Sequence, residues 1–316
     1  MNTLPVEAAW RLAERADAQR WLVTGLWSEQ AVGIVGGEPK CCKSFLALDL
    51  AVAVASGTPC LRHFPVPHPG RVLLYAAEDA LHVVRRRLEG ICAAANLSLQ
   101  ELDVQVITAP TVRLDLPADR ARLERTVEHL KPRLLILDPF VRLHRIDENV
   151  SGEVAPLLAF LRELQRRHAL AVLVVHHAKK GAGHVRAGQA LRGSSEFHAW
   201  GDSNLYLRRL GDELTLSVEH RAAPSMPIIA LELAQNGEAL ALQVHANTPS
   251  VSEPAVPTID ERILGALRES TRAIQIAELR SLCRVRKATL YARLTELVSA
   301  GRLVRSADGY RLAGTA

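Results

Sequence analysis

The sequence predicts an α/β protein whose larger part is built around a mostly parallel sheet, and two observations lead to this prediction. Short runs rich in Val, Leu and Ile alternate with longer helical patterns between residues 32 and 177. The short runs are apolar at consecutive positions, which is typical of strands that are covered on both faces. A strand, a crossover helix and a second strand run the two strands in parallel, so the alternation indicates a doubly wound domain.

Five strands are expected in this alternation, at residues 32–37, 71–78, 102–109, 133–139 and 170–177. The helical patterns between them span residues 43–57, 79–96, 118–130 and 153–168. Farther along the chain, apolar and polar residues alternate, with turn signals at Gly211-Asp212 and Asn236-Gly237. Alternation interrupted by tight turns predicts antiparallel strands between residues 202 and 243.

The chain is expected to divide into a large and a small domain. A polar stretch with three prolines, ending at Pro257, separates them and is interpreted as a linker. The expected boundaries are a helical N-terminal segment at 1–30, the α/β domain at 31–243, the linker at 244–257 and a C-terminal domain at 258–316. Trp10, Trp21 and Trp27 lie on the helical pattern of the first segment.

The composition indicates an aliphatic core, because 48 % of residues are hydrophobic and only 4 % are aromatic. The five cysteines form no C-x-x-C pair, so reduced thiols are expected rather than a disulfide scaffold or a zinc site. A sequence without a long apolar run or a signal-like start is typical of a soluble cytoplasmic protein.

The positive charge is concentrated at the C-terminal end. Residues 258–316 hold 11 Lys and Arg against 6 Asp and Glu, while the remaining residues hold 28 of each sign. The net charge of +5 therefore lies in the last fifth of the chain. Such an asymmetry favours an anionic partner for the C-terminal domain.

A phosphate-binding loop is expected between the first strand and the first helix. The segment GGEPKCCKS ends in Lys-Ser, but Cys42 stands where such loops carry a glycine. If that position needs a positive φ, a side chain there costs about 1–2 kcal/mol, which predicts nucleotide binding weakened by about tenfold. The expected nucleotide-binding residues are Gly37, Glu38, Pro39, Lys40, Cys41, Cys42, Lys43, Ser44 and Phe45.

Polar side chains follow three other expected strands where those strands end. Glu78 ends the second strand, Asp138 ends the fourth, and His176-His177 end the fifth. Because the carboxyl ends of parallel strands meet at one edge of a sheet, we expect these side chains near the phosphate loop. An acid beside the loop serine is typical of a Mg²⁺ site, with Ser44 and Asp138 as the expected metal-binding residues.

These residues give the chain a resemblance to a known family. Five blocks carry it: GEPKCCKSFLALDLAVAVASG, VLLYAAEDALHVVRRRL, LLILDPFVRLHRIDENVSGEVAPLLAFLREL, AVLVVHHAKKG and ALRGSSEFHAWGDSNLYLRR. Between about residues 21 and 242, the chain resembles the RecA-type ATPases of the plasmid RepA hexameric helicase group. The most specific blocks are Asp-Glu-Asn at 147–149, His-His-x-x-Lys at 176–180 and Arg-Gly-Ser-Ser at 192–195.

The resemblance implies a fold, a reaction and a set of roles. It implies a RecA-like P-loop ATPase core that binds ATP and Mg²⁺ through Lys43, Ser44 and Asp138, with Glu78 as the catalytic base. One of His176 and His177 would sense the γ-phosphate. Members of the group self-associate in rings in which a neighbour supplies an arginine, so Arg221 is the first candidate for that arginine and Arg192 the second.

The C-terminal domain resembles a winged helix-turn-helix, because three amphipathic helical patterns precede two short basic strands. Its expected core residues are Ile263, Leu264, Leu267, Ile276, Leu279, Leu290, Leu294 and Leu297. Its expected duplex-DNA contacts are Arg284, Arg286, Lys287, Thr289, Tyr291, Arg293 and Arg305. A docking module for another protein is the alternative reading of this domain. The basic segment 179–192, with Lys179, Lys180 and Arg186, is a second candidate DNA contact, for single strands in a ring's channel.

Two functions from different classes follow from these features. The first is an oligomeric RecA-type ATPase that acts on DNA as a helicase or loader in plasmid, phage or mobile-element replication. The alternative is an ATP-regulated DNA-binding regulator or recruitment factor with little hydrolysis or unwinding.

Overall fold

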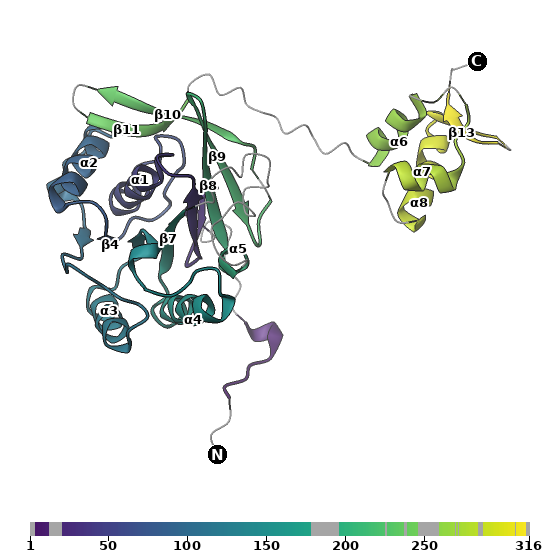
Figure 1. Cartoon of the computed structure of the whole chain (residues 1–316). Helices are drawn as coiled ribbons and strands as arrows, with labels where there is room; N and C mark the ends of the chain where they lie inside the picture. The colour runs from purple at the N-terminus through teal and green to yellow at the C-terminus, as the bar shows by residue number, and fades with distance from the viewer. Residues whose placement is uncertain are drawn as a thin grey trace. The chain divides into compact units, whose positions relative to one another are not determined.

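The computed structural model describes most of the chain as two compact units, Met1–Thr248 and Pro249–Ala316, and each is treated by itself (Figure 1). The described residues are 4–12, 21–177, 196–224, 226–236, 239–245, 259–268, 270, 272–283, 287–306 and 308–313. No helix formed by these residues combines the length and the apolar character that crossing a membrane requires.

A nine-stranded sheet forms the centre of the first unit, in the order β11-β10-β9-β8-β3-β7-β6-β4-β5. The six strands from β8 to β5 are parallel to one another. They are β3 (Val32–Gly37), β4 (Val72–Ala76), β5 (Val104–Val106), β6 (Leu134–Asp138), β7 (Ala171–His177) and β8 (Ser203–Leu210). The unit is therefore a mixed α/β structure with a largely parallel central sheet, as the alternation of strands and helices predicts.

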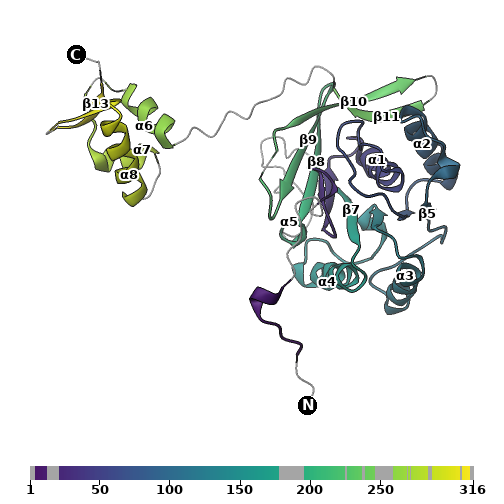
Figure 2. The ribbon, with the colours of Figure 1, turned by 180° about the vertical axis from the view of Figure 1, so that it is seen from behind.

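The antiparallel strands expected after residue 202 extend the same sheet. They are β9 (Glu213–His220), β10 (Ile229–Asn236) and β11 (Ala239–Val244), each antiparallel to the strand before it. The hairpin of β10 and β11 lies against helix α2 (Leu81–Ala94) in both views (Figures 1 and 2). A Cβ on Gly90 of α2 would lie 3.2 Å from the backbone nitrogen and oxygen of Leu240, so this contact favours a residue without a side chain.

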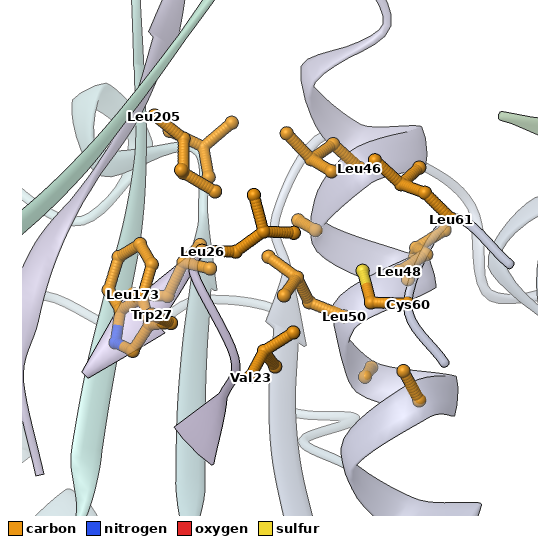
Figure 3. Packing of buried hydrophobic residues seen from close by; sticks show 14 of the residues in the cluster. Val23, Leu26, Trp27, Leu46, Leu48, Leu50, Cys60, Leu61, Leu173 and Leu205 are labelled. Carbon is orange, nitrogen blue, oxygen red and sulfur yellow. The ribbon is translucent and has the colours of Figure 1, made fainter. Parts of the chain in front are cut away.

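Helices cover both faces of the sheet. On one face α1 (Lys43–Ser56) and α2 pack on strand residues such as Val35, Leu173 and Val175. Figure 3 shows Leu46 and Leu50 of α1 in this core, together with Leu173. On the other face α3 (Pro117–Leu130), α4 (Ser151–His168) and α5 (Glu196–Trp200) pack on Ile34, Val172 and Val174 (Figure 2). Alternate residues of one strand thus enter two separate apolar cores, which explains why the strands are apolar throughout.

The helical segment expected at residues 1–30 is wrong for residues 21–28. Trp21–Val23 (β1) and Trp27–Ser28 (β2) pair as an antiparallel hairpin. Trp27 is 1 % exposed, and its Nε1 donates to the carbonyl of Ala31 at 3.3 Å, so this hairpin belongs to the core beside α1 (Figure 3). In the first half, a short 3₁₀ helix (Ala9–Arg11) leaves Trp10 79 % exposed.

The second unit contains three helices and a hairpin. The helices are α6 (Ile259–Arg268), α7 (Ile276–Cys283) and α8 (Lys287–Ser299), and the hairpin pairs β12 (Leu303–Ser306) with β13 (Gly309–Leu312). The core residues named from the sequence are buried, except that Ile276 is only partly buried. Ile274 and Tyr310 exchange two backbone hydrogen bonds of 2.9 Å, which join the hairpin to the segment before α7.

Candidate functional site

The loop between β3 and α1 ends in a left-handed residue, Cys42, directly before the helix begins. Helix α1 begins at Lys43, and Cys42 caps it in the left-handed conformation with φ 65° and ψ 25°. The position that carries glycine in such loops therefore does need a positive φ, and Cys42 accepts it at a cost of about 1–2 kcal/mol. Backbone N–H groups at the start of α1 are left without helical partners and can bind an anion.

Close packing beside the loop fixes where its backbone runs. A Cβ on Gly37 would lie 2.4 Å from the carbonyl oxygen of Leu207 and 2.6 Å from Sγ of Cys41, so only glycine fits. Burial raises the pKa of the Cys41 thiol, although the charge of Lys43 acts in the opposite direction. Cys41 is therefore a packing residue of the loop.

Lys43, Ser44 and Asp138 converge on the space in front of the loop. Lys43 is 6 % exposed, and its Nζ donates to the carbonyl of Glu38 at 2.7 Å. Asp138 is 8 % exposed, and the nearby Ser44 side chain acts to lower its pKa. Burial raises the pKa of Asp138 to about 6, and the carboxylates of Asp79 and Glu78 act in the same direction.

This donor set fits Mg²⁺. A hydroxyl and a carboxylate supply the hard oxygen ligands that Mg²⁺ prefers. A buried carboxylate whose ionised form is disfavoured gains stability when a divalent cation lies beside it. Ser44 and Asp138 would hold the cation, because they lie near each other on the loop side of the sheet.

Glu78 lies at the same edge of the sheet and has a cationic partner. Arg142 of the short 3₁₀ helix Phe140–Arg142 donates from Nε to Glu78 Oε1 at 2.9 Å. The two side chains are 61 % and 43 % exposed, so solvent screens the ion pair and the carboxylate remains accessible to water.

The two histidines at the end of β7 lie on opposite faces of the sheet. On β7, Leu173 and Val175 enter the core on the α1 side, so the alternation of side chains places His177 on that side too. Burial and the charge of Lys43 lower the pKa of His177, which indicates that it lies near the loop. His176 points to the opposite face, where it is 1 % exposed and stacks on Phe197 with ring centroids 4.1 Å apart.

Arg209 lies beside the loop and was missed by the sequence analysis. Its Nη2 donates to Sγ of Cys42 at 3.5 Å. The register that aligns Gly37 with Leu207 brings the end of β8 to the loop, and no local pattern in the sequence encodes that pairing. A groove of about 660 Å³ begins at this side chain, within the size range of small-ligand sites. Its lining is Arg209, Asp212, Glu213, Leu214, Thr215, Ala230, Leu231, Glu232, Leu233 and His245.

Arg221 lies at the other end of the sheet in its own chain. Its backbone bonds to Asp202, which in turn bonds to the first residue of β3, at the amino end of the parallel strands. Its guanidinium lies 3.4 Å from Oδ1 of Asp202 and donates to the carbonyl of Ala199. Among the other residues expected at this site or on a DNA-binding surface, Lys179, Lys180, Arg186 and Arg192 lie outside the described residues.

The second unit places the expected DNA contacts in different settings. Thr289, Tyr291 and Arg305 are exposed. Arg293 instead forms ion pairs with Asp260 and Glu296, and the hydrogen bonds to Arg293 lower the pKa of Asp260. The guanidinium of Arg293 thus joins α8 to α6 within the unit. Arg284 and Arg286 lie outside the described residues, as does the side chain of Lys287.

A comparison with protein families gives a match over the first part of the chain. A family model described as an AAA domain matches residues 1–183, which is more than half of the 316-residue chain. The matched stretch includes the phosphate loop, Glu78, Asp138 and the two histidines.

Proposed function

Because the chain belongs to the AAA domain family of ATPases, we propose that it is an ATP-dependent DNA-transaction protein. In this proposal it is an oligomeric RecA-type ATPase with helicase-like or loader activity in plasmid, phage or mobile-element replication. The observation that carries the proposal is that the buried Asp138 lies near enough to Ser44 and Lys43 for both to lower its pKa. These are the three side chains that Mg-ATP requires of a phosphate loop and of a second strand that ends at the same edge of the sheet.

Nucleotide binding would use the loop as it stands. The N–H groups at the start of α1 and the ammonium of Lys43 would bind the phosphate oxygens, once Nζ of Lys43 exchanges the Glu38 carbonyl for a phosphate. Ser44 and Asp138 would hold Mg²⁺, which when bound neutralises charge on the phosphates. Arg209 is near enough to the loop to contact the nucleotide from β8.

Hydrolysis would use the exposed strand-end side chains. Glu78 would accept a proton from the attacking water, with its second carboxylate oxygen available while Arg142 holds the first. His177, on the loop side of β7, is the better candidate of the two histidines to contact the terminal phosphate. A neighbouring subunit would supply an arginine finger, with Arg221 the first candidate and Arg192 the second, and Arg221 would then have to leave Asp202.

The second unit would be the DNA-binding module. Three helices followed by a hairpin support a winged helix-turn-helix, with α8 as the recognition helix. The exposed Thr289, Tyr291 and Arg305 remain proposed contacts, and the basic balance of the unit favours binding to phosphates. Arg293 is no longer proposed as a contact, since its guanidinium is already paired with two carboxylates.

The test is ATP hydrolysis by the full chain with and without single- and double-stranded DNA, with the mass of the assembly measured in parallel. We expect hydrolysis that DNA stimulates and that Lys43→Ala abolishes, in particles larger than one chain. Hydrolysis that is equal in the wild type and in Lys43→Ala would contradict the site. ATP hydrolysis by single chains, at a rate that no DNA changes, would contradict the proposed helicase-like or loader activity.

One observation favours the alternative function, an ATP-regulated DNA-binding regulator. Lys43 donates to a carbonyl of its own loop, and this hydrogen bond must break before its ammonium binds a phosphate, which favours slow turnover. A regulator would bind DNA in an ATP-dependent manner without separating strands. Strand separation coupled to hydrolysis would exclude this alternative.

A further inference from the structure

The Asp-Glu-Asn block at 147–149 has no role in the proposed site, yet hydrogen bonds hold two of its side chains, Asp147 and Asn149. Asp147 Oδ1 accepts hydrogen bonds from the backbone and side-chain nitrogens of Asn149, at 2.9 and 2.8 Å. The backbone nitrogen of Asp147 donates to Glu153 in the first turn of α4 at 2.9 Å. Asp147 and Asn149 therefore form the turn that leads into α4. Glu148, between them, takes no part in these hydrogen bonds.

Glu148 turns into the protein and lies between two buried imidazoles. Its Oε1 is 3.3 Å from Nε2 of His144 and 3.8 Å from Nδ1 of His176. The three side chains are 14 %, 2 % and 1 % exposed, respectively. A carboxylate is rarely buried this far without groups that stabilise it, so its position between the imidazoles is specific.

Aromatic rings extend this contact to the ends of two strands. The ring of Phe140 lies 4.6 Å from that of His144 and 5.3 Å from that of Phe197, and Phe197 stacks on His176. Phe140 follows Asp138 at the end of β6, and His176 precedes His177 at the end of β7. The cluster of Phe140, His144, Glu148, His176 and Phe197 thus lies behind the two strand ends that carry Asp138 and His177.

We infer that Glu148 is a positioning residue that fixes the ends of β6 and β7 relative to each other. Through His144 and Phe140 it constrains the segment after Asp138, and through His176 it constrains the segment that carries His177. This inference rests on the proposed function, because it assigns Glu148 to the geometry of the nucleotide site. Glu148 itself does not touch the nucleotide.

The charge state of Glu148 agrees with this role. Burial raises its pKa, but the imidazoles of His144, His176 and His177 outweigh burial, so the pKa lies below its usual range. The carboxylate is therefore ionised at neutral pH. Both imidazoles face the same oxygen, Oε1, and an ionised carboxylate oxygen is a stronger acceptor for an imidazole N–H than a neutral amide oxygen.

The test compares Glu148→Gln with Asp147→Asn in the full chain. Glu148→Gln keeps the shape and removes the charge between the imidazoles, while Asp147→Asn makes the same chemical change in the solvent-exposed turn. A displacement of the strand ends by about 1 Å costs about 100-fold in rate, so we expect Glu148→Gln to lower kcat by about 10- to 100-fold. The KM for ATP is expected to change less than kcat, because Lys43 and the start of α1, which would bind the phosphates, are not part of the cluster.

A second readout follows the histidines directly. In NMR spectra of histidine-labelled protein, Glu148→Gln is expected to move the imidazole signals of His144, His176 and His177. Asp147→Asn is expected to move none of them. Wild-type kcat together with an unmoved His177 signal in Glu148→Gln would overturn the inference.

Two further outcomes, a variant that does not fold and a wild type without ATP binding or hydrolysis, lead to different conclusions. If Glu148→Gln does not fold, His144→Phe decides, because it keeps a ring against Phe140 and removes the nitrogen that faces Glu148. A lowered kcat in His144→Phe supports the inference and a wild-type kcat overturns it. If the wild type neither binds nor hydrolyses ATP, the proposed function fails, while the His177 signal in Glu148→Gln still decides whether Glu148 positions β7.

Discussion

Replacing Cys42 by glycine probes the unusual residue of the phosphate loop. Cys42 already has φ 65° and ψ 25° in the folded chain, so its strain contributes to the free energy of folding. The sequence alone had assigned this strain to nucleotide binding, as a loss of about tenfold in affinity. The structure assigns it to the free energy of folding instead.

The magnitude follows from two opposing contributions. Removing Cβ from a left-handed residue relieves about 1–2 kcal/mol. Glycine gives the unfolded chain more conformational freedom, which lowers the free energy of unfolding by about 0.4–1 kcal/mol. The Cys42 thiol also loses its contact with Arg209, but thiol hydrogen bonds are weak. The expected net result is a gain of about 1 kcal/mol in the free energy of unfolding.

The assay is urea unfolding of the full chain, followed by the fluorescence of tryptophans such as the buried Trp27. Cys42→Ala is the matched control, because it removes the thiol and keeps the Cβ. We expect Cys42→Gly to be more stable than Cys42→Ala by about 1 kcal/mol, with ATP affinity changed by less than about threefold. A glycine variant no more stable than the alanine variant, or one that binds ATP about tenfold tighter, would refute this reasoning.

Three other substitutions test particular contacts. Trp27→Ala is expected to lower the free energy of unfolding, measured in urea, by about 3–5 kcal/mol, because it empties a core position. A loss of only about 0.5 kcal/mol, typical of an exposed residue, would be inconsistent with the buried hairpin. Arg221→Ala is expected to lower the melting temperature by breaking the contact with Asp202, while ATP affinity measured by calorimetry is unchanged. Unchanged melting with abolished turnover would instead favour the finger role. Asp260→Asn is expected to flatten the acid dependence of the second unit in circular dichroism, because the folded pKa of Asp260 is lowered by Arg293. The stability that the Asp260–Arg293 pair contributes is complete above the unfolded pKa of about 3.8 and is lost as pH falls through the folded pKa. An unchanged acid transition in Asp260→Asn would contradict a contribution of this pair to stability.

The layout of the sheet could be predicted where the sequence pattern is local. The run 134–137 is apolar throughout because both of its faces are covered, and this appears directly in the residues. The hairpin at Trp21–Ser28 could not be predicted in the same way. Its strands are only three and two residues long, too short to show an alternation, and burial against α1 decides their conformation.

The candidate site was predicted to the extent that it depends on strand ends. Glu78, Asp138 and His177 could be placed at one edge because parallel strands end together. Arg209 depends on which strand lies next to β3, and Arg293 depends on a carboxylate 33 residues away in the chain. Long-range pairings of this kind leave no periodic signal, so the sequence suggested a DNA contact for Arg293 where the structure has an internal ion pair.

The central claim is that Lys43, Ser44 and Asp138 form a Mg-ATP site, and titration calorimetry with ATP tests it most directly. The wild-type chain in the presence of Mg²⁺ is expected to bind ATP with a measurable heat, and Lys43→Ala is expected to lose that binding. Omitting Mg²⁺ is expected to weaken binding to the wild type, because Ser44 and Asp138 then have no cation to share with the phosphates. Equal ATP binding by the wild type and by Lys43→Ala would contradict the account.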